Sequence, residues 1–478
     1  MRLSMLSYLL LLATISSSAM AQRGFEKEPD YFPLGGIQAQ AEVEETKNGK
    51  GIVIRSIVSK GMADKSGLLV GDIITKVGGK PLGGKTMDEV IDKFCAAVEK
   101  TEGKKPQGKY GRLKIVVQRS GKTTKIDLKV RPFPAFSKND PKKCKKTPKI
   151  LIDGLNFLAD RQQDEGHQLH VSNENHAVAT VALAGLAWIG SGKKKYAKNI
   201  TKAAEFIMAK AGNERDMSGM RSASASKANW NQTNWSLSYA TIFLSEYLAQ
   251  KKRPAVKRRL QEIVNKLQDN QEASGGWAHG PGGKNALDYL ELEIMSNLAL
   301  GGMGMAQRVG VKLDDAKVIR GYHYVKKCTT GGGVAYSPLP GQAGHGDPGR
   351  TAGAFWALRQ IGKGKALQAS MAKYYAPKVG KLYEGHACPT MHIWNGAIAS
   401  AVLGKKAYSN YWKAWRPFIM ASRTSDGAFG CRPTDESRQL KQHTDRTWGP
   451  SFVTAHYLVS LMVGQGRYKL LDTSMPKQ

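Results

Sequence analysis

The hydrophobic pattern of the chain changes character near residue 132. Before that point, short apolar runs are separated by glycine turns, a pattern typical of strands. The predicted strands are 52–58, 113–119 and 124–130. A capping box at Thr86–Glu89 opens one helix whose apolar positions fall on a single face. These features predict a small α+β domain over residues 30–132.

From residue 150 onward, the apolar positions follow helical spacing, and loops of glycine, serine and asparagine separate the helical segments. The twelve predicted helices are 150–162, 176–190, 196–211, 233–249, 253–269, 287–305, 313–327, 350–362, 366–379, 393–404, 408–422 and 450–464. Every second helix is apolar all round, whereas its partners carry lysines on one face. Because a helix that is apolar all round must be buried, six inner and six outer helices are expected. The order predicts a multidomain chain whose second domain, residues 150–466, is an all-α (α/α)6 toroid.

The segments on either side of the toroid differ from it in composition. Residues 133–149 are rich in proline and lysine, which predicts a stiff basic linker. Cys144 lies in this linker, and we expect its side chain to be exposed. Residues 467–478 are predicted to form a tail.

The first 21 residues have the three parts of a secretory signal peptide. Arg2 supplies a positive charge, residues 6–15 form a short apolar run, and Ala19–Ala21 is a cleavage site of small residues. A transmembrane anchor is the alternative, but it needs about 18 or more apolar residues. The sequence therefore predicts a secreted or periplasmic protein with no transmembrane segment after cleavage.

The chain is strongly basic, with 72 lysine and arginine residues against 39 aspartate and glutamate residues and a formal net charge of +33. Such a field attracts anionic partners without choosing among them. For a secreted protein we expect an acidic polysaccharide or an anionic envelope surface, unless the lysines merely solvate the outer helices. The sequence has no helix-turn-helix, no zinc finger and no basic segment interleaved with aromatic residues, so we expect no nucleic-acid partner.

Three glycine-containing motifs characterise the first domain. They are GMADKSGL at 61–68, VGDII at 70–74 and VGGKP at 77–81. Together they make residues 30–132 similar to a PDZ domain of the type found in bacterial secreted proteases. This resemblance implies a domain that takes a peptide C-terminus as an added strand at its sheet edge. No Gly-x-Ser-x-Gly motif is present, which argues against a protease.

The resemblance also implies where a peptide binds. A glycine loop holds the terminal carboxylate, because its successive N–H groups point into one concavity, and the facing helix supplies apolar contacts. The matching residues are Leu34, Gly35, Gly36, Ile37, Met87, Val90 and Ile91. Protein or peptide C-termini are therefore the expected partners. The alternative is that the loop is a plain glycine turn and the domain docks onto the toroid of its own chain.

Glycine-aromatic turns recur just before predicted inner helices of the second domain. They are SGGW at 274–277, GGGVAY at 331–336 and DGAFG at 426–430. These turns resemble the repeat signature of the prenyltransferase and squalene-cyclase superfamily. The whole arrangement, from signal peptide to toroid, resembles a secreted family of planctomycete-type bacteria whose toroid is a domain of unknown function.

All inner helices of a toroid run in one direction, so the loops before them meet around a central pit. Histidines and tryptophans concentrate in these loops and in the first turns of the inner helices. Pits with aromatic walls and a few polar groups are common ligand sites. The residues expected to bind a ligand in the pit are His176, Trp235, Trp277, His279, His392, Trp394, His443 and Trp448.

The sequence predicts no cofactor. The acidic motif of the cyclases is absent, but His386, Cys388 and His392 could together hold zinc, which cysteine and histidine ligands suit. A disulfide between Cys388 and Cys431 is the alternative for one of these residues.

Catalysis is a further alternative, because folds of this kind commonly cleave polysaccharides. Hydrolysis needs two facing carboxylates, and a β-elimination needs a base and a charge neutraliser. The candidate catalytic residues are His345, Arg350, His386, Asp288 and Asp445, and further candidates for these roles are Glu291, Asp347, Glu384, Asp426, Tyr383 and Asn395. The first interpretation is a secreted cell-envelope binding or scaffold protein. The second is an enzyme, a lyase or a hydrolase, that acts on acidic polysaccharide.

Overall fold

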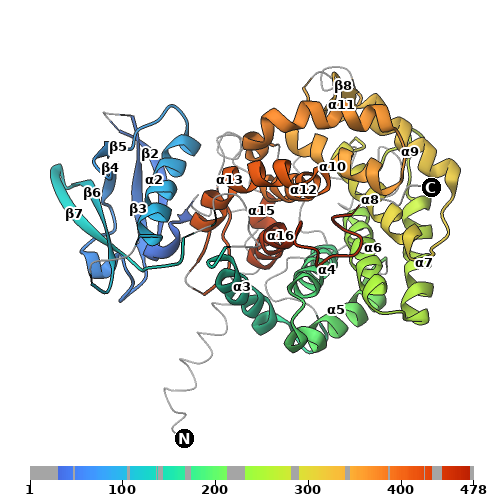
Figure 1. Cartoon of the computed structure of the whole chain (residues 1–478), viewed down its shortest axis with the longest axis horizontal. Coiled ribbons are helices and arrows are strands. Elements are labelled where there is room, and N and C mark those ends of the chain that lie inside the picture. The colour runs from blue at the N-terminus through green and yellow to red at the C-terminus, as the bar shows by residue number, and fades with distance from the viewer. Residues whose placement is uncertain are drawn as a thin grey trace, which may run out of the picture.

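The computed structural model separates a strand-rich N-terminal domain from a ring of helices (Figure 1). It describes residues 31–473, apart from 47–48, 105–107, 136, 138–143, 167–173, 213–231, 281–289, 340–344, 386–387, 425 and 433–443. The signal peptide predicted for residues 1–21 lies outside the described residues and stays a prediction. In the described part of the chain, no helix is both long and apolar enough to cross a membrane.

The N-terminal domain is an antiparallel sheet covered on one face by a helix. Its sheet order is β1-β2-β3-β4-β6-β7, with β5 paired to β4. Thr86 caps the helix by accepting a hydrogen bond from the Glu89 backbone N–H, as the capping box predicts. The elements are β1 (Phe32–Pro33), η1 (Gly35–Ile37), β2 (Ala39–Thr46), β3 (Gly49–Ile57), η2 (Asp64–Ser66), β4 (Ile73–Val77), β5 (Lys80–Pro81), α2 (Met87–Glu102), β6 (Gly111–Arg119) and β7 (Lys122–Val130).

The inner helices of the second domain are buried on every side. In α6, for example, each residue from Thr233 to Leu248 is buried. Side chains on such helices can only be apolar, small or hydrogen-bonded, which explains the sequence pattern. Among the described residues, the inner helices are α4 (Glu174–Ser191), α6 (Thr233–Gln250), α8 (Glu293–Arg308), α10 (Pro348–Gln360), α12 (Pro389–Leu403) and α16 (Pro450–Met462).

The outer helices bury one face against the inner ring and turn the other to solvent. Strand pairs, 3-10 turns and one short helix connect the two layers. In the described part of the chain, the outer helices are α3 (Thr147–Arg161), α5 (Ala197–Lys210), α7 (Pro254–Asp269), α9 (Asp315–Lys327), α11 (Lys365–Tyr375) and α13 (Lys405–Ala421). The connecting elements are η4 (Lys194–Tyr196), β8 (Thr329–Thr330), β9 (Gly333–Val334), η5 (Ala376–Glu384) and α15 (Thr444–Trp448).

The ring closes upon itself. Each inner helix contacts the next, and α16 contacts both α12 and α4, so first and last helices meet (Figure 1). The twelve predicted helices therefore match the twelve observed ones within a few residues at most ends. The largest differences lie at the starts of α8 and α12, which begin at Glu293 and Pro389 rather than at 287 and 393, and at the end of α11, which stops at Tyr375 rather than at 379.

Four glycine turns, each in the loop before an inner helix, fix that loop against the outer helix that follows in the ring. Gly166, Gly275, Gly332 and Gly427 all adopt a positive φ, between +85° and +96°. At each of them a Cβ atom would collide with a backbone carbonyl of an outer helix, on α5, α9, α11 and α3 respectively. The last of these contacts joins the turn after α13 to α3, so the same device closes the outer layer.

At the end of three of these turns, a backbone N–H group donates a hydrogen bond to a hydroxyl group on the inner helix that follows. Trp277 N–H donates to Ser296 Oγ at 3.0 Å, Val334 N–H to Thr351 Oγ1 at 3.0 Å, and Phe429 N–H to Thr454 Oγ1 at 2.9 Å. The three hydroxyl groups lie on α8, α10 and α16. The glycine-aromatic turns seen in the sequence are thus the parts of the repeat that set the spacing between layers.

The segment predicted as a tail packs into the ring in its described part. The backbone N–H groups of Lys469, Leu470 and Leu471 donate to the carboxylate of Glu246 at 2.7–3.1 Å. Trp356 Nε1–H donates to the Leu471 carbonyl at 2.9 Å. Residues 467–473 therefore plug the ring at the C-terminal ends of α6 and α10.

The linker is not a free connector, and the exposure predicted for Cys144 is wrong. Cys144 is buried in the core of the toroid. Lys146 is fully buried, and its Nζ lies 2.5 Å from Glu102 Oε2 of α2. The linker end therefore packs between the two domains.

Replacement of Gly332 by alanine tests the glycine device, with neighbouring Gly331 as the control. Both have a positive φ, but a Cβ at Gly331 meets no atom, whereas one at Gly332 collides with the Ser370 carbonyl. We expect Gly332→Ala to lower the free energy of unfolding by about 2–4 kcal/mol and Gly331→Ala by about 1 kcal/mol. Urea denaturation followed by circular dichroism measures both; equal losses would contradict the role of the close approach.

Candidate functional site

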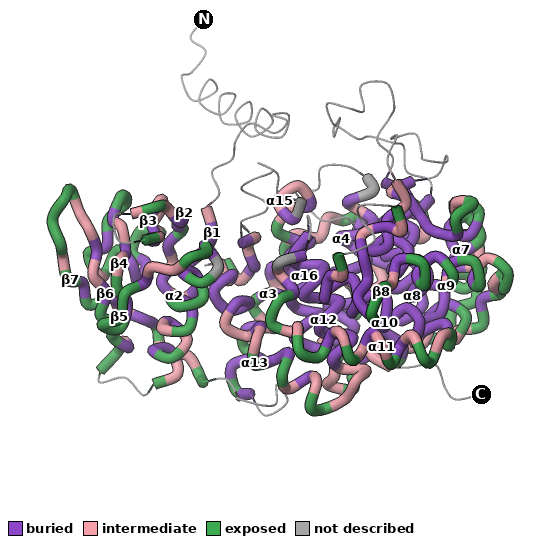
Figure 2. The backbone as a smooth tube through the Cα atoms, turned by 90° about the horizontal axis from the view of Figure 1, so that it is seen from above, coloured by how far each residue is buried: buried purple, intermediate pink, exposed green. Residues whose placement is uncertain are grey.

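The first turns of the inner helices meet on one rim of the toroid. His176 at the start of α4 stacks on Trp448, which ends α15 just before α16, and Asp347 before α10 contacts His392 at the start of α12. Figure 2 shows α15 on one face of the molecule. The rim divides into an aromatic half, on α4, α6 and α16, and a charged half, on α8, α10 and α12.

The aromatic half brings together four of the residues that the sequence placed in the pit. The rings of His176 and Trp448 lie 4.0 Å apart, and Trp235 Nε1–H donates to His279 Nδ1 at 2.8 Å. The rings of Trp235 and Trp448 meet edge to face at 6.4 Å. His176, Trp235 and Trp448 are buried, and His279 is partly buried. The four rings therefore pack against one another as one cluster.

Burial keeps the histidines of this cluster neutral. It lowers the pKa of His176 to about 4, although the hydrogen bond with Gln232 opposes the shift. Burial also lowers the pKa of His279 to about 3. Neutral imidazoles beside indole rings can accept and donate hydrogen bonds, but they carry no charge near pH 7.

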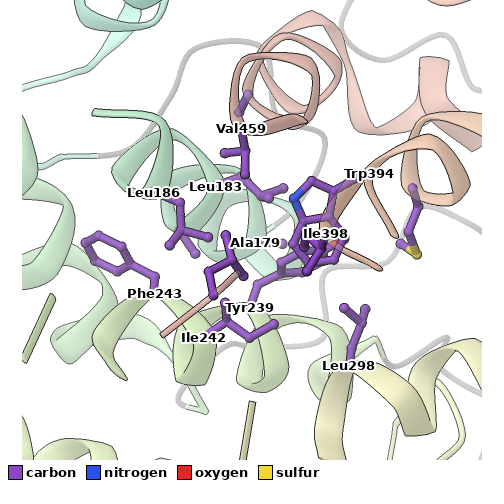
Figure 3. Packing of buried hydrophobic residues seen from close by; sticks show 14 of the residues in the cluster. Ala179, Leu183, Leu186, Tyr239, Ile242, Phe243, Leu298, Trp394, Ile398 and Val459 are labelled. Atoms are coloured by element: carbon purple, nitrogen blue, oxygen red, sulfur yellow. The ribbon is translucent and has the colours of Figure 1, made fainter. Parts of the chain in front are cut away.

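The centre of the ring is filled rather than hollow around Trp394. This indole lies among Tyr239, Ile398 and Leu298, in the apolar packing of the inner helices (Figure 3). Tyr239 Oη and His456 Nε2 lie 3.0 Å apart beside it. Trp394 is therefore a core residue at this depth of the ring.

Trp277 lies away from the rim. Its indole N–H donates to the Leu267 carbonyl of α7 at 2.7 Å, and its ring packs near Gly321 of α9. It thus fills the space between the inner and outer layers, as its position in a glycine-aromatic turn requires.

The charged half of the rim joins four polar side chains from three inner helices. His392 Nδ1 lies 3.0 Å from Asp347 Oδ1, and the same carboxylate oxygen caps α10 by accepting the Arg350 backbone N–H at 2.7 Å. Glu293 at the start of α8 accepts a hydrogen bond from Asn297 at 2.9 Å. Glu293 and His392 are fully enclosed, and Asp347 and Arg350 are each 7% exposed.

The two carboxyl groups differ in protonation. Burial raises the pKa of Glu293 well above its usual range, while Arg350 and Asn297 oppose the rise. Burial acts in the same direction on Asp347, but His392 and Arg350 more than offset it and bring its pKa to about 2. The surroundings of Glu293 thus favour its neutral acid form, whereas those of Asp347 favour its anion.

Two glycines of α10 make room for this cluster. A Cβ at Gly349 would collide with the His392 ring, and one at Gly353 would press on the amide groups of Asn395 and Asn297. Side chains from α8 and α12 can therefore approach each other across the first turns of α10. The half-buried Tyr336 covers the cluster, with its ring centre 5.6 Å from the Arg350 guanidinium.

The remaining catalytic candidates lie elsewhere. Asp445 is buried and accepts hydrogen bonds from Cys388 Sγ at 2.7 Å and Thr390 Oγ1 at 2.6 Å. His345 is exposed beside the entry to α10. Asp288, His386 and His443 lie outside the described residues.

The proposed metal ligands are engaged by other groups where they are described. Cys388 contacts Asp445, and His392 contacts Asp347. No group of three or more histidine, cysteine, aspartate or glutamate residues that could hold a metal ion occurs among the described residues. Cys388 and Cys431, the alternative disulfide partners, are not joined by a disulfide bond.

The peptide-binding residues expected in the first domain are mostly internal. Leu34, Ile37, Met87, Val90 and Ile91 are buried and belong to the core of this domain. Gly35 and Gly36 form η1 and face α13 of the toroid.

Glu293 was missed at the sequence level. The candidate residues were expected mainly in the loops, whereas this residue falls inside the helix predicted over 287–305. The available signal was an acidic residue directly before the apolar residues Ile294 and Met295 of a predicted inner helix. A charge in such a helix is costly unless it has a specific partner or task.

Fold and site together define a protein with a small sheet domain docked to a closed toroid of paired helices, whose rim holds a buried acid cluster. Its first domain matches the PDZ domain profile over residues 53–99. The chain belongs to the family described as Domain of unknown function (DUF6288), whose profile matches residues 147–461. A search of the curated proteins found no match.

Several solved structures are similar to the helical part of this chain. The GH76A α-1,6-mannanase from Salegentibacter sp. HEL1_6 has 11% identity and a TM-score of 0.46, and the alignment covers 67% of this chain and 99% of the mannanase. An α-amylase from Clostridium perfringens has 11% identity, a TM-score of 0.41 and coverages of 66% and 97%. A polysaccharide lyase has 10% identity, a TM-score of 0.41 and coverages of 66% and 96%. None of these similarities assigns an activity to this chain.

The neutral histidines make stability fall in acid. In the unfolded chain the His279 side chain binds a proton below about pH 6.5, whereas in the folded protein it does so only near its pKa of about 3. The contribution of neutral His279 to the free energy of unfolding is therefore complete above pH 6.5 and is lost as the pH falls toward 3. Between pH 6 and 4, we expect His279→Gln to reduce the slope of unfolding free energy against pH by about 1.4 kcal/mol per unit. Urea denaturation at several pH values measures it, with exposed His323→Gln as control. An unchanged slope would contradict the assignment.

Proposed function

We propose that the toroid is an enzyme that hydrolyses glycosidic bonds in polysaccharide, with Glu293 as the proton donor. One observation carries the proposal: two carboxyl groups at the rim, Glu293 and Asp347, have environments that drive their pKa values in opposite directions. Such a pair supplies an acid and an anion at the same pH, which is what hydrolysis of a glycosidic bond requires.

The roles follow from the protonation states. Glu293 transfers its proton to the leaving glycosidic oxygen as the bond to the anomeric carbon breaks. The Asp347 carboxylate faces the developing positive charge and takes a proton from the attacking water. The His392 imidazole, 3.0 Å from Asp347, orients this carboxylate, and the Arg350 guanidinium stabilises its charge.

The substrate class follows from charge. The chain has a formal net charge of +33, and such a field concentrates anionic polymers. Arg350, 7% exposed at the rim, would meet a sugar carboxylate or sulfate first. Together with the signal peptide predicted for residues 1–21, this supports an acidic polysaccharide outside the cytoplasm as the substrate.

Access to the acid requires a movement at the rim. Glu293 is fully enclosed, and its backbone N–H donates to the Tyr336 carbonyl at 3.0 Å. The ring of Tyr336 lies over Arg350 and is half-buried. In the proposal, a sugar ring displaces the Tyr336 side chain and takes its place against the guanidinium.

The scaffold interpretation keeps a role for the first domain. A PDZ domain suggests protein or peptide partners, and such a partner would bring the toroid to its site of action at the cell envelope. In this proposal the toroid catalyses the reaction, and the PDZ domain determines where in the envelope the protein binds.

Glu293→Gln tests the proposal, because glutamine keeps the size of the side chain and the acceptor for Asn297 but has no acidic proton. We expect the release of reducing ends from alginate, pectate or sulfated glycans to fall by about 10²–10⁴-fold. Glu205→Gln, at an exposed position of the outer helix α5, is the control and should retain activity. Thermal denaturation verifies that both variants are folded.

Two results would contradict the proposal. One is release of reducing ends that is unchanged in Glu293→Gln. The other is the appearance of double-bond absorbance in the products, which would identify β-elimination, with Arg350 and Asn395 as charge neutralisers, in place of hydrolysis.

A further inference from the structure

The PDZ domain and the toroid share one interface, built from α2 and α13 (Figure 1). Ala421, the last residue of α13, belongs to the core cluster of the PDZ domain rather than to that of the toroid. Helix α13 therefore ends inside the first domain, next to η1.

The glycine loop of the PDZ domain meets the carboxyl end of α13. A Cβ at Gly35 would lie 3.1 Å from the Met420 carbonyl oxygen and 3.3 Å from Ala421 Cα, and Gly35 itself has a φ of +62°. A Cβ at Gly36 would collide with the Glu102 carboxylate, which pairs with Arg423. Both glycines that the sequence assigned to a carboxylate site are thus required for this contact.

Charge complementarity reinforces the contact. Arg416 Nε lies 2.9 Å from Glu99 Oε1 and Arg423 Nη2 lies 2.9 Å from Glu102 Oε1. A third arginine of the toroid, Arg432, lies 3.1 Å from Asp92. Helix α2 therefore presents its acidic groups to arginines that flank the end of α13.

The packed interface leaves little room for another ligand between the loop and α13, whereas a separate cavity of about 380 Å³ borders Gly35 and Gly36 on the side of Phe133 and Asp153. The cavity between Leu34, Cys95 and Met420 has a volume of about 10 Å³, at the lower limit for a single water molecule. In addition, β1 pairs with the start of β2, at Phe32 with Ala41 and at Pro33 with Gln40, so part of the strand edge beside the loop is already taken.

We infer that this face of the PDZ domain recognises the carboxyl end of an arginine-bearing helix, which α13 supplies within the same chain. The last carbonyl groups of a helix carry partial negative charge, as a terminal carboxylate does, and a glycine loop can approach either closely. A competing partner must offer the same chemistry: a basic segment that ends in exposed carbonyl or carboxylate oxygens. In the intact chain α13 occupies this face, so another C-terminus that binds here must displace it.

A charge swap in the full-length chain tests this inference through the thiol of Cys95. This thiol is buried at the interface, and burial raises its pKa to about 12, so it resists alkylation while the domains are docked. We expect Arg416→Glu to raise the rate of Cys95 alkylation by N-ethylmaleimide at least roughly tenfold. Adding Glu99→Arg should restore protection. Lys413→Glu, exposed on the same helix, should leave the rate unchanged. Peptide mass mapping separates Cys95 from the other cysteines.

A direct binding measurement completes the test. A fluorescent synthetic peptide with the sequence of residues 411–423 should bind the Arg416→Glu variant and leave the unmodified chain unbound, as measured by anisotropy. Equal binding to both chains would overturn the inference, as would a Cys95 rate that Arg416→Glu does not change. Failure of Glu99→Arg to restore protection would show that the variant is damaged rather than undocked, which also counts against the pairing. None of these readouts depends on hydrolysis, so the inference and the proposed activity can fail separately.

Discussion

The close approach of glycine turns to outer-helix carbonyls is the constraint on which the toroid depends. At Gly166, Gly275, Gly332 and Gly427 the backbone occupies space that any Cβ would need. Each contact sets the distance between a loop and an outer helix, and thereby the direction in which the next inner helix begins. The fourth contact joins the turn after α13 to α3, so the same glycine contacts also close the ring. Once the ring is closed, the inner helices are buried on every side.

Complete burial determines what chemistry the rim can host. A carboxyl group placed at the start of a buried helix has no water to stabilise its charge, so its protonation depends on the few side chains that reach it. Glu293 has an amide partner and stays neutral, whereas Asp347 has an imidazole, a guanidinium and a helix N-terminus and stays ionised. The opposite arrangement holds at the domain interface, where acidic and basic groups pair directly and serve docking.

The sequence predicts the fold well and the site only in part. Periodicity located all twelve helices and the strands β3, β6 and β7, because burial on one face or on every side determines which residue types each position can hold. The aromatic cluster could also be predicted from the sequence, because its members lie in or beside equivalent loops that precede inner helices. Glu293 was not, because its role depends on Arg350 and Asp347, which lie more than 50 residues away in the chain. The burial of Cys144 in the toroid core and the packing of α13 against the PDZ domain depend on tertiary contacts, which local composition does not encode.

The plug formed by residues 467–473 has a consequence for how the molecule is made. Three backbone N–H groups of this segment satisfy Glu246, which is otherwise enclosed on α6. During synthesis, α6 is therefore made more than 200 residues before the N–H groups that hydrogen-bond the Glu246 carboxylate. Until then the toroid is open at its base, where the Gln250 amide holds the Glu246 carboxylate at 2.9 Å, and a chain cut short before residue 467 would leave this buried acid facing water.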